Sequence, residues 1–339
     1  MKIVLDVFGG DYAPKEIVLG MIGAINADKD IEVVAVGDET KINEVLNEQK
    51  FKSDRVTIVD AKDVITNDES PTMAIKLKKE SSLVKAFDYL MANDDAVALV
   101  SAGSTGAVLT GAFMKAGRIK GVSRPALAPI LPTVKHGGVV LCDCGANVDC
   151  KAVNLLHFGI MGAAFAGAML KIENPKIGLL SNGAEDKKGN ELCHEAFALL
   201  KESGLNFAGN CEARDILSGE YDVIVADGFN GNIALKSAEG TANAVFGLLK
   251  EGIKNGGLRA KLGAGLLLPT LKKLKKEMDY NENGGACFLG VNKVVVKSHG
   301  ASKAKSITAS ILQAKDLAKF DVVGKIADYI GKIDKRDEE

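Results

Sequence analysis

Short apolar runs alternate with amphipathic segments along the whole chain, and few folds accommodate that alternation. Most of the runs are unbroken stretches of β-branched residues, which is typical of strands covered on both faces. We expect strands at Lys2–Val7, Ile31–Gly37, Val56–Val59, Ala96–Ser101, Gly138–Asp143, Lys176–Ser181, Asp222–Ala226 and Lys293–Lys297. Helical segments are expected near residues 14–27, 71–92, 104–118, 150–170, 188–203, 230–254 and 303–318. Strands that alternate with helices predict an α/β fold, a three-layer α/β/α Rossmann-like sandwich with a mostly parallel sheet.

The 339-residue chain contains no linker rich in proline, serine or charge. We therefore expect residues 1–331 to form a single interlocked α/β catalytic unit of one or two lobes, followed by a charged, frayed tail at 332–339. The 43 basic and 44 acidic residues leave a net charge of −1, tryptophan is absent, and aromatic residues make up 5%. This composition argues against a nucleic-acid partner, which requires a basic surface or aromatic side chains for stacking.

Neither a membrane span nor an export signal is expected. The longest uncharged apolar run, Phe158–Leu170, is shorter than the roughly 20 residues that cross a bilayer as a helix. The stretch Ile3–Leu5 is too short for the core of a signal peptide. We expect a cytoplasmic protein whose six cysteines stay reduced. No Cys-x-x-Cys pair occurs and there are four histidines, so the sequence predicts no metal site.

Four of the predicted strands lead into loops of unusual composition. Glycines lie beside hydroxyl, amide or charged side chains in Ala102–Ala107, Asn182–Asn190, Asp227–Asn232 and Ser298–Ser302. Glycine lets the backbone approach a ligand, and free N–H groups at the start of a helix favour an anion. Because ligands gather beyond the carboxyl ends of parallel strands, these loops predict a site for a phosphate-type ligand. Any one of them alone would equally suit a helix cap or a turn.

Two nucleotide-binding patterns are missing, since no G-x-G-x-x-G follows a strand and no G-x-x-x-x-G-K-[ST] occurs. Lys187 and Lys188 are expected to open a helix, where the helix dipole disfavours cations. Two lysines in succession there indicate an anion between them and the backbone amides. His299 lies in a glycine-flanked strand-end loop, as a candidate general acid or phosphate donor, or as a hydrogen-bonded structural histidine.

Several motifs in order resemble one family. The segment Asp6–Asp11, followed by Ala13 and Pro14, is similar to the N-terminal signature of the bacterial fatty acyl-[acyl-carrier-protein]:phosphate acyltransferases of phospholipid synthesis. Further similar stretches lie at Lys78–Ser82, Ser101–Ala107, Gly117–Pro129, Asp143–Asp149, Gly183–Glu191, Glu212–Asp215, Asp227–Asn232, Gly284–Ala286 and His299–Ser302. Phe8, Ser104 and Ala301 stand where that family usually has Met, Asn and Ser, and Ser104 keeps a hydroxyl in its loop.

The resemblance implies a fold related to isocitrate and isopropylmalate dehydrogenases and to phosphotransacetylase, in a homodimer. It implies an acyltransferase that moves a long-chain fatty acyl group from acyl-carrier protein to inorganic phosphate, without a cofactor or metal. The product, an acyl phosphate, would pass to a membrane glycerol-3-phosphate acyltransferase. A peripheral position at the inner face of the cell membrane is therefore also expected.

For this reaction, positioning and stabilisation of the developing oxyanion should supply most of the acceleration. We place Lys187 and Lys188 on phosphate, together with Ser104 and Thr105. Asn232 is the candidate donor to the thioester carbonyl or to phosphate, and His299 the candidate proton donor to the leaving thiol. The other predicted binding residues lie in the same motifs: Gly103, Asn147, Asp227, Gly228 and Ser302.

Residues 258–280 differ from the rest of the chain. Leu262–Pro269 is expected to form an apolar, glycine-containing turn, and Leu271–Met278 an amphipathic helix with lysines beside its apolar face. This helix either packs at a dimer interface or forms a tip that contacts anionic lipid. Its lysines, or Lys78 and Lys79, are also candidates for docking an acidic carrier protein.

Three other functions fit parts of the sequence. A phosphotransacetylase-like acyltransferase would use acyl-CoA as the donor. A decarboxylating dehydrogenase of the related fold is disfavoured, because only six arginines are available to grip a di- or tricarboxylate. A non-catalytic phosphate-binding scaffold at a lipid surface would leave the four polar loops unexplained.

Overall fold

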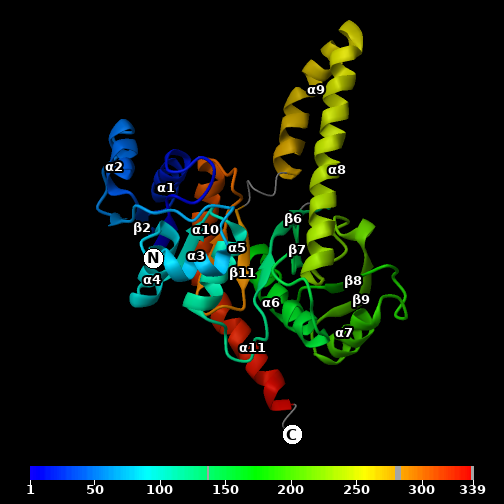
Figure 1. Ribbon diagram of the computed structural model, residues 1–339. Coiled ribbons are helices and arrows are strands. Elements are labelled where there is room, and N and C mark those ends of the chain that lie inside the picture. Colours follow the sequence, from blue (N-terminus) through cyan, green and yellow to red (C-terminus); the bar gives the residue numbers. More distant parts are fainter. Residues whose placement is uncertain (136, 279–283, 337–339) are drawn as a thin grey trace.

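The structure, a computed structural model, describes residues 1–135, 137–278 and 284–336, and it has two lobes with a long helical hairpin projecting from one of them (Figure 1). The first lobe is built on a seven-stranded sheet of order β3-β2-β1-β4-β12-β11-β5, in which β11 is antiparallel to both of its neighbours. Its strands are β1 (Lys2–Asp6), β2 (Glu32–Gly37), β3 (Val56–Asp60), β4 (Ala96–Ser101), β5 (Ala126–Ala128), β11 (Ala286–Leu289) and β12 (Val294–Lys297).

The second lobe is built on a five-stranded sheet of order β6-β7-β10-β8-β9. Its strands are β6 (Ile130–Pro132), β7 (Gly138–Cys142), β8 (Ile177–Ser181), β9 (Phe207–Glu212) and β10 (Val223–Val225). All of its neighbours are parallel except β6, which is antiparallel to β7. Pro129 alone separates β5 from β6, so a single extended segment passes from the edge of the first sheet to the edge of the second.

Helices cover both faces of the first sheet, as successive residues of β1 show. Ile3 and Leu5 belong to a core shared with α1 (Lys15–Ala27) and α10 (Ala304–Lys319). Val4, which points to the opposite face, belongs to a core shared with α4 (Ser82–Ala92) and α5 (Thr105–Gly111). Side chains of a strand alternate between faces, and apolar residues on both require two covering layers. The predicted three-layer α/β/α fold with mostly parallel strands is confirmed.

A buried helix links the cores of the two lobes. Most of α6 (Ala152–Leu170) is buried, and its core cluster runs from Ile3 in the first sheet to Val140 and Ile177 in the second. Within the described part of the chain, α6 is the helix that is long and apolar enough to cross a membrane, and 67% of that stretch is buried inside the protein. The remaining helical segments are α2 (Glu39–Glu48), α3 (Pro71–Leu77), the π-helical η1 (Ala112–Ala116), α7 (Glu191–Glu202), the 3₁₀ turn η2 (Ala213–Asp215) and α11 (Val322–Arg336).

All eight predicted strands form, but they divide between two sheets, where the pattern predicted one. The sequence pattern did not predict β5, β6, β9, β11, α2 or α11. The first two strands are three residues long and bounded by prolines, while β9 carries a glycine and an asparagine among few apolar residues. Such segments gain their strand geometry from neighbours rather than from their own pattern. The predicted tail is shorter than expected, because 332–336 belong to α11, while 337–339 lie outside the described residues.

The projecting hairpin consists of α8 (Gly228–Asn255) and α9 (Gly257–Met278). The predicted turn at Leu262–Pro269 is wrong, because α9 continues through it and contains Pro269. The reversal lies instead at Gly256 and Gly257, where a φ of +69° at Gly257 suits glycine. The last two residues of the predicted 258–280 segment lie outside the described residues.

Candidate active site

The carboxyl ends of β1, β4 and β12 bring together three loops that are far apart in the sequence. The strands are parallel neighbours, and Ser101 at the end of β4 is paired with Lys297 of β12. Two hydrogen bonds join the loops beyond them: Ser298 N donates to Ser101 O at 2.9 Å, and Asp11 N donates to Gly300 O at 2.8 Å. This first cluster holds five of the predicted site residues: Gly103, Ser104, Thr105, His299 and Ser302.

A buried carboxylate fixes the glycine loop of this cluster. Asp6 accepts hydrogen bonds from Ser82 Oγ at 2.6 Å and Ser101 Oγ at 2.7 Å, and Ser101 Oγ accepts one from Gly103 N at 3.0 Å. Burial raises the pKa of Asp6, while the two hydroxyls oppose that shift. A Cβ built on Gly9 would stand 2.6 Å from Gly103 N, so the backbone of the loop after β1 contacts that of the loop after β4. The loop after β4 is therefore fixed by the hydrogen bonds that run from Asp6 through Ser101 and by the backbone contact with Gly9.

Several donors of the first cluster remain available to a ligand. Ser104 precedes α5, but its side chain makes no capping hydrogen bond. Ser302 Oγ is buried and has no hydrogen-bond partner among the described residues. His299 is exposed, and its Nδ1 accepts a hydrogen bond from Ala301 N at 3.1 Å. When Nδ1 accepts, a neutral imidazole carries its proton on Nε2, which is then free to donate.

Lys297 is a residue of this cluster that the sequence analysis missed. It ends β12, is only 8% exposed, and its Nζ donates to the carbonyl of Ser298. Burial lowers its pKa to about 8, while the charges of Asp11 and Asp6 oppose the shift. The sequence pattern placed Lys297 only at the end of an apolar strand. A lysine at that position, directly before the glycine-flanked loop of His299, is the signal that could have identified it.

The second cluster begins at Asp143, which follows β7 and is fully buried. Its Oδ1 accepts a hydrogen bond from Leu127 N at 2.8 Å, and its Oδ2 accepts from Asn147 N at 2.7 Å and Asn147 Nδ2 at 3.0 Å. Burial raises the pKa of Asp143, and these donors oppose the shift. Asn147 Nδ2 also donates to Pro125 O at 2.7 Å. The Asn147 side chain, predicted to bind substrate, is thus engaged within the protein.

The start of α8 rests on the same loop. Asp227 caps the helix by accepting a hydrogen bond from Asn230 N at 2.9 Å, and Gly228 N donates to Asn147 O at 2.8 Å. Asp227 thus serves as the N-cap of α8, and Gly228 makes a backbone contact with the Asn147 loop.

Close approach at the next turn of α8 decides where Asn232 lies. A Cβ on Gly231 would stand 1.9 Å from Asp143 O, so only glycine lets the helix sit this close to the loop. Asn232 follows directly, is exposed, and lies beside Gly145, where an added Cβ would stand 3.5 Å from Asn232 Cγ. Its amide is therefore presented to solvent at the base of α8.

The loop between β8 and α7 carries the two predicted phosphate lysines. The expectation that Lys187 and Lys188 open a helix is wrong, because α7 begins at Glu191. Gly189 has a φ of +110°, and Asn190 caps the helix by accepting a hydrogen bond from Cys193 N at 3.0 Å. Both lysines are exposed loop residues. The argument from the helix dipole loses its basis, and their candidacy rests on the loop itself.

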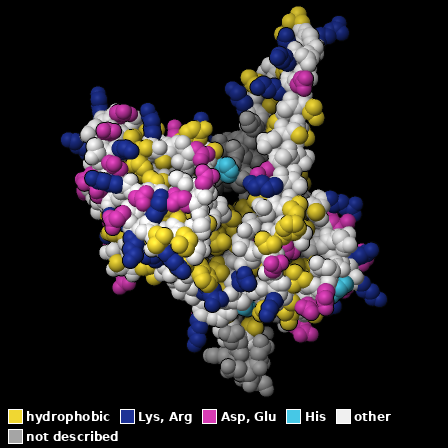
Figure 2. All heavy atoms as spheres, in the orientation of Figure 1, with side chains coloured by type: hydrophobic (Ala, Val, Ile, Leu, Met, Phe, Trp, Pro, Cys, Tyr) yellow, Lys and Arg dark blue, Asp and Glu magenta, His cyan; other side chains and the backbone are white. Residues whose placement is uncertain are grey.

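The predicted site residues thus form two clusters, one at the carboxyl ends of each sheet, rather than one. Figure 2 shows the molecule hollowed between the lobe of the first sheet and the base of α8. The second cluster includes that base, and it holds Asn147, Lys187, Lys188, Asp227, Gly228 and Asn232.

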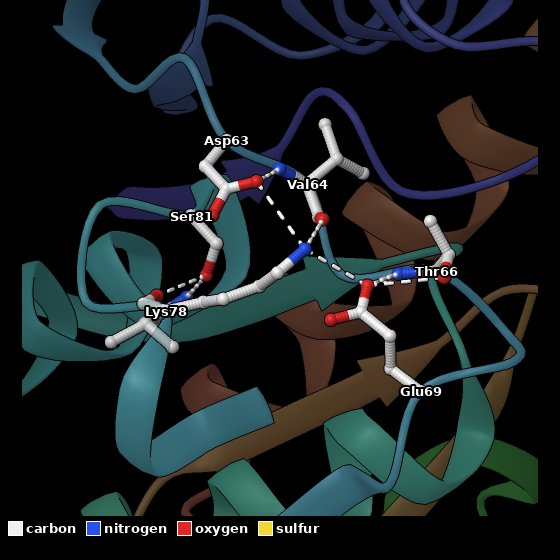
Figure 3. A network of polar contacts seen from close by, with 7 residues as sticks. Asp63, Val64, Thr66, Glu69, Lys78 and Ser81 are labelled. Atoms are coloured by element: carbon white, nitrogen blue, oxygen red, sulfur yellow. Dashed lines mark hydrogen bonds and ion pairs between the residues drawn. The ribbon is translucent and has the colours of Figure 1, made fainter. Parts of the chain in front are cut away.

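Lys78, a predicted docking residue for an acidic protein, is satisfied internally. Figure 3 shows its ammonium group between three acceptors. Lys78 Nζ donates to Val64 O at 2.8 Å and Glu69 Oε1 at 2.9 Å, and it lies 3.4 Å from Asp63 Oδ1. The hydrogen bond to Glu69 raises the pKa of Lys78, while the hydrogen bonds from Thr66 N and then from Lys78 lower the pKa of Glu69. Of the predicted pair, only Lys79 remains an exposed loop cation.

All six cysteines are free thiols, and four of them are buried. Among the described residues, no group of three or more His, Cys, Asp or Glu is placed to hold a metal ion. Burial raises the pKa of Cys287 and Cys211 to about 12 and that of Cys150 to about 11, so these thiols stay protonated near neutral pH. They act as small apolar side chains.

Comparison with known proteins assigns the chain to a family. A family model described as "Fatty acid synthesis protein" matches residues 1–325. The chain belongs to this family. A protein named phosphate acyltransferase from Clostridium novyi is 48% identical over 330 residues, covering 97% of this chain and 98% of the relative. One of the same name from Bacillus pumilus is 45% identical over 332 residues and covers 98% of each chain.

The family membership confirms the resemblance found in the motifs and makes this chain an acyltransferase of lipid biosynthesis. Solved structures agree on the fold. A phosphotransacetylase from Streptococcus pyogenes matches with a TM-score of 0.61 at 19% identity, covering 94% of each chain. A branched-chain phosphotransacylase from Enterococcus faecalis matches with a TM-score of 0.59 at 15% identity, covering 94% of this chain and 99% of its own.

Lys297 provides a test of the first cluster that does not depend on activity. Its pKa is about 8 in the folded chain and 10.5 ordinarily, so between these values the unfolded chain binds more protons. Stability contributed by this group therefore increases as pH rises through that window and is lost as pH falls through 8. The unfolding free energy of the native chain, relative to Lys297→Met, should increase by about 2 kcal/mol from about pH 7 to 10. Chemical denaturation measures it, with Lys293→Met as the control for losing a lysine. A difference that is constant with pH would contradict the prediction.

Proposed function

We propose that this acyltransferase moves a long-chain fatty acyl group from acyl-[acyl-carrier protein] to inorganic phosphate, which gives acyl phosphate and free carrier. The observation that carries the proposal is the loop between β8 and α7, where Lys187 and Lys188 are exposed and form no ion pair within the described residues. Neighbouring cations without a carboxylate partner attract a multiply charged anion such as phosphate. The family's description as a fatty acid synthesis protein supports a fatty acyl donor.

The chemistry is attack of a phosphate oxygen on the thioester carbonyl carbon. A C–O bond forms, negative charge develops on the carbonyl oxygen, and collapse breaks the C–S bond and releases a thiolate that takes up a proton. Because the thioester is already activated, positioning and charge stabilisation supply most of the acceleration, and neither a metal nor a covalent enzyme intermediate is required.

Six of the predicted residues have a role in this scheme. Lys187 and Lys188 neutralise phosphate, and the hydroxyls of Ser104 and Thr105 orient it. The exposed amide of Asn232 donates to the carbonyl oxygen or to phosphate, and His299 Nε2–H protonates the leaving sulfur. Residues of the first and second clusters must then face the same substrate across the hollow between the lobes.

The donor decides between this function and its alternatives. The purified chain should form acyl phosphate, trapped with hydroxylamine, from palmitoyl-[acyl-carrier protein] and phosphate, and no product without phosphate. Rates with palmitoyl-CoA that equal or exceed those with the carrier would assign the phosphotransacetylase-like reaction instead. Phosphate binding without turnover of either donor would indicate the non-catalytic scaffold.

The lysine loop makes a separate prediction. Lys187→Ala should raise the KM for phosphate by about tenfold or more, because a charge-assisted hydrogen bond contributes roughly 1.5–3 kcal/mol. The fold should be unaffected, since the side chain is exposed. Steady-state kinetics at varied phosphate measures the effect. Lys250→Ala, which changes an exposed lysine of α8 with no ion pair among the described residues, is the matched control. Native KM values in Lys187→Ala would remove this residue from the phosphate site.

We also propose a homodimer that works at the cytoplasmic face of the membrane, so that the acyl phosphate reaches a membrane glycerol-3-phosphate acyltransferase. The projecting hairpin exposes several large apolar side chains, including Val245, Leu248 and Leu266. Exposed apolar surface of this kind marks protein–protein or membrane contacts. At its far end Leu258 is 75% and Leu262 64% exposed. Hydrophobic and basic side chains lie together there (Figure 2). This combination suits an anionic lipid surface.

The far end of the hairpin, where Leu258 lies, is therefore the part to test. Leu258→Glu should abolish binding to phosphatidylglycerol vesicles in a flotation assay, because it places a carboxylate against anionic lipid. Leu77→Glu, which changes a 71% exposed leucine of the first lobe, should bind as the native chain does. If Leu258→Glu binds normally, or if it changes the oligomeric state in solution, the hairpin end is not the lipid contact.

A further inference from the structure

A large apolar cavity lies along the base of the projecting hairpin. Its volume is about 1020 Å³, it is open to solvent on one side, and it is lined by one face of α8, by Leu274 of α9 and by segments around β8, α7 and η2. The α8 residues that line it recur every three or four positions from Asn230 to Leu249, which is one stripe of a helix. Near the base that stripe is made of small side chains, Ala234, Ala238 and Ala242, which leave room beside the helix.

One end of the cavity is polar and belongs to the strand-end loops. Asn182 and Asn190, which flank the lysine loop, line that end together with Asn230 at the start of α8. Ser181 lines it as well, and its hydroxyl is buried without a hydrogen-bond partner among the described residues. From there the cavity runs along α8 past Thr241 and Val245. The polar end thus adjoins the proposed phosphate site, and the rest is apolar.

We propose that this cavity holds the acyl chain of the donor, with the thioester at the polar end; the inference rests on the proposed function. The span of α8 from Ile233 to Leu249 measures about 24 Å at the rise of an α-helix. Half the hydrocarbon core of a bilayer, about 15 Å, approximates the length of one acyl chain. A long chain therefore fits within the cavity. An acetyl group would leave nearly all of it empty, so the cavity selects for chain length.

The small residues of α8 and the apolar residues that line the same cavity give the reason for this selectivity. Ile216 and Leu217 line it together with Ala234 and Ala238. Each methylene of a chain moved from water into such a wall improves binding by about fourfold. A large side chain in the stripe would exclude several methylenes without touching the polar end.

Ala242→Phe tests the assignment, with Ala244→Phe as its matched control, because Ala244 is an exposed alanine of α8 that does not line the cavity. The ratio of kcat/KM for palmitoyl over butyryl donors should fall by more than about tenfold in Ala242→Phe and stay native in Ala244→Phe. Binding of the fluorescent fatty acid cis-parinaric acid, which needs no turnover, should weaken in the first variant only.

Failure of the proposed function and failure of this inference give different results. If the native chain makes no acyl phosphate, the proposed function fails, while cis-parinaric acid binding still decides whether the cavity accepts a chain. Unchanged probe binding in Ala242→Phe overturns the cavity assignment. So does a change in sedimenting mass in that variant alone, because a second copy of the chain would then be what covers this face.

Discussion

The carboxylate of Asp143 lies entirely out of contact with water, and four donors surround it: Leu127 N, Ala146 N, Asn147 N and Asn147 Nδ2. A buried carboxylate is costly unless such donors compensate it. Leu127 belongs to the segment that joins the two sheets, and the carbonyl of Asn147 accepts a hydrogen bond from Gly228 N at the start of α8. The junction of the lobes and the base of the hairpin therefore depend on one buried group, and its removal would leave several buried N–H groups unpaired.

The two clusters of polar residues contain both buried and exposed charged groups. In the first, Asp6 and Lys297 are buried at the ends of parallel strands, where their hydrogen bonds fix loop geometry. In the second, Lys187 and Lys188 are exposed and contribute little to stability, but their charge remains available. Burial fixes the position of a group and exposure lets it attract a ligand. A site that must orient phosphate and also capture it benefits from both.

The direction of α8 is set where it begins. Because Gly231 allows the helix to approach within contact of the Asp143 backbone, the stripe of small residues that follows faces the segments around β8 and η2. The same contact presents Asn232 at the base of the helix. The close contact at Gly231 therefore positions both a candidate donor and the start of the helix that lines the apolar cavity.

The amino-acid sequence by itself determined the fold class, because unbroken apolar runs such as Ile3–Leu5 require cover on both faces, and that requirement is local. It also determined the family, through motifs spread over the chain. It did not determine that the strands divide between two sheets, since no local pattern records which strands are neighbours. Only the tertiary structure showed that the Asn147 side chain is hydrogen-bonded within the protein, that Lys187 lies in a loop and that Lys297 is buried. Burial and hydrogen-bond partners are decided by residues distant in the chain.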